Sequence, residues 1–68
     1  GNFMKLQLIK LNHNGTTRCF KTIREIELFY SRKVPREDYN LYITAAIHDK
    51  VLQVEFREGK LGVVGVGT

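Results

Sequence analysis

The stretch TIREIELFYSRK, residues 22–33, decides the fold, because it is the one segment of the chain with the pattern of an amphipathic helix. Thr22 and Glu25 have the spacing of a capping box, in which the hydroxyl caps the first turn and the carboxylate reaches back to the N–H of the cap. Apolar residues then recur at helical spacing and form one stripe: Ile23, Ile26, Phe29 and Tyr30. We expect the helix to end before Pro35 and to pack this stripe, widened by Leu28, against a sheet.

A β-hairpin is expected before the helix, because Asn-Gly at positions 14–15 separates two apolar runs. We prefer a three-residue loop with Gly15 in a bulge, which places Leu8 opposite Phe20. A two-residue turn would place Ile9 opposite Phe20 instead. The second strand covers residues 17–21. A helix that starts near Thr17 is the competing interpretation, but it would leave the capping box unused inside a helix.

Three further strands are expected after the helix. Residues 40–47 alternate, with Leu41, Ile43, Ala45 and Ile47 on one face, although a helix from Pro35 through Ala46 is the alternative. Residues 52–56 alternate cleanly, and residues 61–67 form a glycine-spaced final strand. The sequence therefore predicts an α+β domain of order ββαβββ, with a mostly antiparallel sheet and one helix packed on one face.

Length and composition indicate one small domain with a thin core, since the chain has 68 residues. Gly1 to Phe3 precede the only methionine, and we expect them to be a remnant of an expression vector, with residues 4–68 as the domain. Cys19 is the only cysteine and no apolar run is long enough to span a membrane, so we expect a cytoplasmic protein without a membrane partner.

No catalytic, metal or nucleotide motif is present, and we expect neither an enzyme nor a cofactor. The glycines of GKLGVVGVG, residues 59–67, have neither the dinucleotide nor the P-loop spacing. His48-Asp49 is the only histidine next to a carboxylate, and no further ligands lie at useful spacing.

Two binding hypotheses remain. Residues 1–24 carry five basic and no acidic side chains, whereas residues 25–68 carry six basic and seven acidic ones. The basic hairpin could follow a phosphate backbone, which makes a nucleic-acid-binding accessory protein the alternative function. Its candidate contacts are Lys5, Lys10, Arg18, Lys21 and Arg24.

The preferred hypothesis is a non-enzymatic interaction protein that binds another protein or a second copy of itself. A glycine–valine strand at the edge of a sheet leaves backbone groups available for a further strand. A second basic cluster lies at the exit of the predicted helix. The candidate protein-binding residues are Arg32, Lys33, Arg36, Val63, Val64 and Val66.

Overall fold

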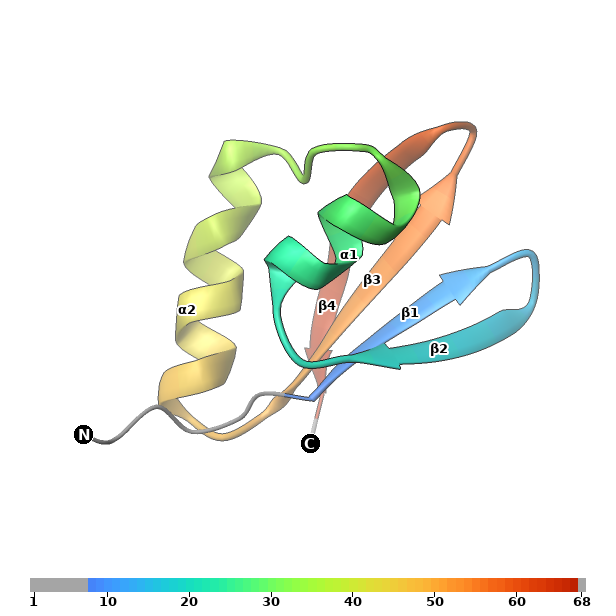
Figure 1. Cartoon of the computed structure of the whole chain (residues 1–68). Coiled ribbons are helices and arrows are strands. Elements are labelled where there is room, and N and C mark those ends of the chain that lie inside the picture. The colour runs from blue at the N-terminus through green and yellow to red at the C-terminus, as the bar shows by residue number, and fades with distance from the viewer. Residues whose placement is uncertain (1–7, 68) are drawn as a thin grey trace.

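The computed structural model describes residues 8–67, which form a four-stranded sheet with two helices on one face (Figure 1). Residues 1–3 and Lys5 lie outside the described part of the chain. The elements in chain order are β1 (Ile9–His13), β2 (Thr16–Phe20), α1 (Ile23–Tyr30), the 3-10 turn η1 (Arg36–Asp38), α2 (Tyr39–Ile47), β3 (Val51–Arg57) and β4 (Lys60–Gly67).

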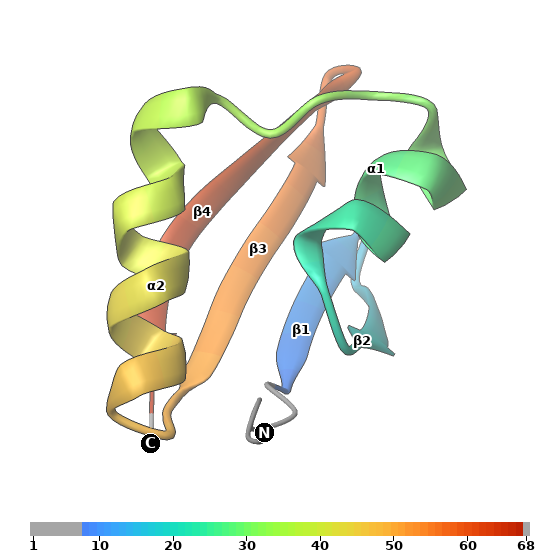
Figure 2. The ribbon, with the colours of Figure 1, turned by 60° about the vertical axis from the view of Figure 1, so that its left-hand side comes forward.

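The strand order is β2-β1-β3-β4, with β1 parallel to β3 and both outer pairings antiparallel. Two hairpins therefore form the sheet, and the chain between them carries both helices across the same face (Figure 2). The α+β class is confirmed. The order ββαβββ and the single helix are wrong, because a parallel β1–β3 pair needs a long crossover connection, and α2 is part of it.

The register of the first hairpin also differs from the preferred one. Ile9 lies opposite Phe20 and His13 opposite Thr16, so the loop has two residues, Asn14 and Gly15. Both have positive φ, 53° and 82°, as a type I′ turn requires. This register gives β1 a face with Ile9 and Leu11 fully buried, whereas the predicted pairing of Leu8 with Phe20 would have turned these side chains toward solvent.

Helix α1 begins as predicted and ends earlier. The Thr22 hydroxyl accepts from the Glu25 N–H at 3.1 Å, and the Glu25 carboxylate accepts from the Lys21 N–H at 3.0 Å, one residue before the cap. The helix stops at Tyr30 because Ser31 adopts a left-handed conformation with φ of 55°. Ile23 and Ile26 are buried, whereas Phe29 is exposed on its outer side.

The segment predicted as a strand, residues 40–47, is helix α2. The alternation of Leu41, Ile43 and Ala45 predicted a strand wrongly. This helix is apolar on several sides, and such a segment has no clear helical period. Its N-terminus follows the acidic turn Glu37-Asp38, which complements the helix dipole. Only Ala45 is fully buried, and Tyr42 is the partly buried side chain of α2 that packs against the core.

The core lies between the sheet and the helices. Its buried members are Ile9, Leu11, Ile23, Ile26, Val34, Ala45, Leu52, Val54 and Leu61. An aromatic cluster closes the end of the core near the first hairpin turn. In this cluster Tyr30 stacks on Phe56 with ring centroids 4.5 Å apart, and His13 meets Phe56 edge-on at 4.8 Å. These contacts fix α1 over β1 and β3.

Candidate protein-interaction site

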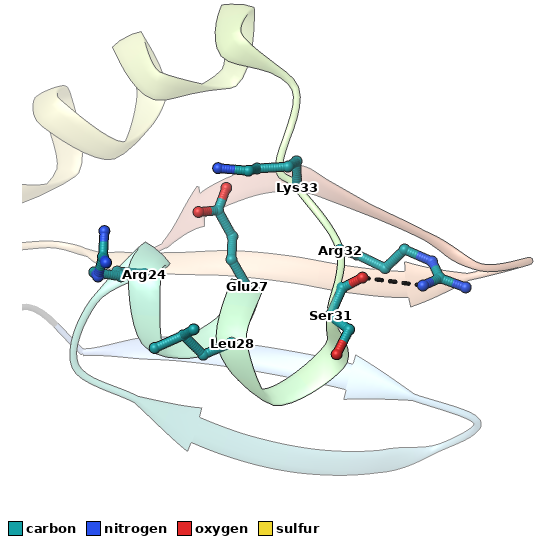
Figure 3. Close-up of a pocket in the computed structure, with 6 residues that line it drawn as sticks. All are labelled: Arg24, Glu27, Leu28, Ser31, Arg32 and Lys33. Carbon is teal, nitrogen blue, oxygen red and sulfur yellow. Dashed lines mark hydrogen bonds between the residues drawn. The ribbon is translucent and has the colours of Figure 1, made fainter.

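A hollow with a volume of about 430 Å³ runs along the outer side of α1. We refer to it as the α1 groove (Figure 3). Its lining comes from α1 and the two residues that follow the Ser31 cap: Arg24, Glu27, Leu28, Ser31, Arg32 and Lys33. Three cations, one carboxylate and one large apolar side chain therefore share a single hollow.

Glu27, the acid of the groove, is held by two hydrogen bonds to the connection between the helices. Its Oε2 accepts from the Val34 N–H at 2.9 Å and from the Tyr39 hydroxyl at 3.1 Å. Desolvation, followed by the hydrogen bond and the negative charge of Glu27, raises the pKa of the Tyr39 phenol above its usual value. The carboxylate thus fixes where α2 starts relative to α1.

Arg32 is also held in place, but it points out of the groove. Its Nε donates to the Gly59 carbonyl at 2.9 Å, so the guanidinium lies toward the β3–β4 turn (Figure 3). Arg24 and Lys33, in contrast, have no carboxylate within 4 Å among residues 8–67. These two cations are the ones available to an anionic group.

Apolar side chains of both helices are exposed on the same layer. Leu28 on α1 is 70% exposed beside the two cations. On α2, Ile43 and Ile47 are 51% and 69% exposed and lie one helical turn apart. We refer to Ile43 and Ile47 as the α2 outer face. Further apolar side chains are exposed on the same two helices: Phe29, Tyr39 and Leu41. Single exposed apolar residues are ordinary, whereas several on one helical layer make that layer a candidate interaction surface.

The four described residues of the predicted nucleic-acid site are not gathered on one face. Lys10 alternates with the buried Ile9 and Leu11, so it projects from the sheet face without helices. Arg18 lies on the helix side, 5.1 Å from the centre of the Phe29 ring. Lys21 is exposed in the connection to α1 and Arg24 lines the α1 groove, while Lys5 lies outside the described residues.

The predicted protein-binding residues are partly brought together. Arg32 and Lys33 line the α1 groove, whereas Arg36 lies in η1 and does not. Val63 and Val66 are packed against the core. Val64 is 62% exposed, because a register shift between Gln53 and Val54 leaves it as the extra residue of a bulge.

The outer edge of β4 is less open than its composition predicts. The Asp38 carboxylate accepts from the Val63 N–H at 3.1 Å, so η1 occupies one backbone donor of this edge. The bulge at Val64 interrupts the edge further. Bulges and covering segments are common protections against strand addition. The strand-addition hypothesis is therefore weaker at β4 than the sequence alone suggests.

The sheet face opposite the helices offers a shallower hollow of about 250 Å³. Lys10 and Glu55 both line it, with Asn12, Thr17 and Gln53 nearby. Cations and acids are mixed here, as on an ordinary solvated surface. In contrast, the α1 groove has an excess of positive charge.

Sequence reasoning missed Leu28 and the α2 outer face as exposed residues. The alternation places Ile43 and Ile47 on one face of a predicted strand, and Leu28 widens the stripe that is predicted to pack against the sheet. The signal that could have found them is the excess of apolar residues around 39–47, more than a short helix can bury on one side.

Within residues 8–67, no group of three or more His, Cys, Asp or Glu side chains is placed to hold a metal ion. No helix in the same part of the chain has the length and apolar character that crossing a membrane requires. Comparisons with protein-family models, with curated proteins and with solved structures found no match to this chain. Its function is therefore inferred from its own residues.

Proposed function

We propose that this protein is a non-enzymatic module that binds another protein through its helical layer. The observation that carries the proposal is the exposure of Leu28, Ile43 and Ile47 on the two helices that cover one face of the sheet. Burying a large aliphatic side chain contributes about 1.5–3 kcal/mol, so a partner that covered these three would gain substantially.

The chemistry of the α1 groove supports binding over catalysis. Ser31 is its only hydroxyl, and the groove has no histidine or cysteine that could activate it. Its one carboxylate, Glu27, accepts two hydrogen bonds that hold the helix connection. Such a carboxylate serves the fold and is poorly suited to act as a general base.

The charge of the groove favours a different protein over a second copy of the same chain. A symmetric pair would bring the same surface of each copy together. The two net-positive grooves would then face each other, and like charges across an interface oppose association. A partner with acidic residues on its contact surface has no such conflict.

Site-specific photo-cross-linking tests the proposal. A photoreactive residue in place of Ile47, in the full chain expressed in its source cells, should give one defined protein adduct. The matched control is the same residue in place of Val64, which is similarly exposed on a different part of the surface. An added Ile43→Lys substitution should reduce the adduct without unfolding the chain, since changes at exposed sites rarely exceed about 0.5 kcal/mol.

Two results would contradict the proposal. The first is the same set of adducts from positions 47 and 64, because such adducts would reflect random collisions. The second is an adduct at twice the mass of the chain, which would identify a second copy as the occupant of this surface.

A further inference from the structure

We infer that the α1 groove holds an acidic segment of the partner protein. One large apolar side chain of that segment packs on Leu28, and its carboxylates lie beside Arg24 and Lys33. This inference rests on the proposed function and specifies the chemistry of the partner. The groove supplies the selectivity for this segment.

The size of the groove fits one anchoring side chain and its neighbours. Its volume of about 430 Å³ lies in the range of pockets that bind compact ligands. Leu28, which lines it, is the most exposed large aliphatic residue of α1. Interface energy concentrates at apolar anchors in such hollows, surrounded by polar residues that exclude water.

The charge of the groove selects an acidic occupant. Two cations, Arg24 and Lys33, remain in the groove beside one carboxylate, because Arg32 points out of it. The Oε2 of that carboxylate already accepts from the Val34 N–H and the Tyr39 hydroxyl. In Figure 3 Arg24 lies to one side of Glu27, and the Lys33 side chain extends over the Glu27 carboxylate. A segment that carries acids next to an apolar residue would complement this arrangement.

A nucleic acid fits these observations less well. Binding of a phosphate backbone needs a row of cations, and binding of single strands needs exposed aromatic platforms. The lining of the groove contains no aromatic residue. Two further candidates are placed elsewhere, since Lys10 is on the opposite sheet face and Arg18 sits over Phe29.

A titration followed by amide NMR tests the inference on the full chain. The probe is a synthetic amphipathic peptide of leucine and glutamate, compared with a peptide in which lysine replaces every glutamate. The glutamate peptide should shift the amide signals of residues 24–33 at low salt, and the shifts should weaken at high salt. The lysine peptide should leave them unchanged.

Matched variants locate the contacts. Arg24→Gln with Lys33→Gln should weaken binding of the glutamate peptide roughly tenfold, whereas Lys10→Gln with Arg57→Gln removes the same charge elsewhere and should have little effect. Leu28→Ser should weaken it as well, and Val64→Ser should not. These positions are all exposed, so the folded chain should be retained.

Three results would overturn the inference. They are no shift of the amide signals at about millimolar glutamate peptide, an equal loss of peptide binding in both double variants, or an oligonucleotide that binds the same residues more tightly than the peptide does. If one of these results is obtained while the adduct at position 47 is still formed, the acidic segment is ruled out and the proposed function is retained. If no adduct forms at position 47, the proposed function is ruled out.

Discussion

Replacing Glu27 by alanine should destabilise the protein strongly, because this side chain joins the two helices. It accepts from the part-buried Val34 N–H at 2.9 Å and from the Tyr39 hydroxyl at 3.1 Å. A hydrogen bond to a charged group contributes about 1.5–3 kcal/mol, and the exposed phenol adds roughly 0.5 kcal/mol. We expect Glu27→Ala to lower the free energy of unfolding by about 2–3.5 kcal/mol, a large part of the total for a domain of this size.

Urea unfolding followed by circular dichroism measures this loss, with the slope as a check that the unfolded state is unchanged. Glu27→Gln keeps one acceptor oxygen and should lose only about 1 kcal/mol. Glu37→Ala is the control, since it removes the same charge from an exposed position in η1. A Glu27→Ala variant within about 0.5 kcal/mol of this control would refute the assigned role.

Three further changes test other parts of the structure. Asp38→Ala should leave the Val63 N–H without its acceptor, cost about 1–2 kcal/mol and speed hydrogen exchange at that amide. Asn14→Ala should cost about 1 kcal/mol in thermal unfolding, because Asn14 has a φ of 53° in the two-residue turn; a neutral result would argue against that turn. The third change concerns pH. The raised pKa of Tyr39 means that the folded state holds the phenol proton more tightly than the unfolded chain does. Its contribution is complete below a pH of about 10 and is lost as the pH rises through the folded-state pKa. Tyr39→Phe should abolish this loss of stability at alkaline pH. If the free energy of unfolding falls with the same slope at alkaline pH in both proteins, the assigned role of Tyr39 is contradicted.

Local signals in the sequence predicted part of the fold correctly. The capping pair Thr22 and Glu25 located the start of α1, because a cap is formed by residues close in sequence. The strict alternation of residues 52–56 predicted β3, whose partners on both sides are other strands. Asn14-Gly15 predicted a hairpin turn, although the preferred loop length was wrong.

The predictions failed where contacts between distant parts of the chain determine the secondary structure. Residues 40–47 contain β-branched and aromatic side chains that favour a strand, yet they form a helix because the parallel pairing of β1 with β3 leaves them in the crossover. The same error concealed Ile43 and Ile47 as surface residues. For the candidate site, Arg32 and Lys33 were singled out from their sequence, but Arg24 was grouped with the hairpin because its position in the groove depends on the helix turn.

The acidic partner segment is tested most directly by identifying the sequence that contacts Leu28 in the cell. A photoreactive residue in place of Leu28, in the full chain, should form an adduct whose cross-linked peptide can be sequenced by mass spectrometry. We predict a segment of another protein that is rich in Asp and Glu and is attached at or beside a large apolar residue. The adduct should disappear when Arg24→Glu and Lys33→Glu are introduced. An adduct to a basic segment, to a second copy of this chain or to a nucleic acid would contradict the account.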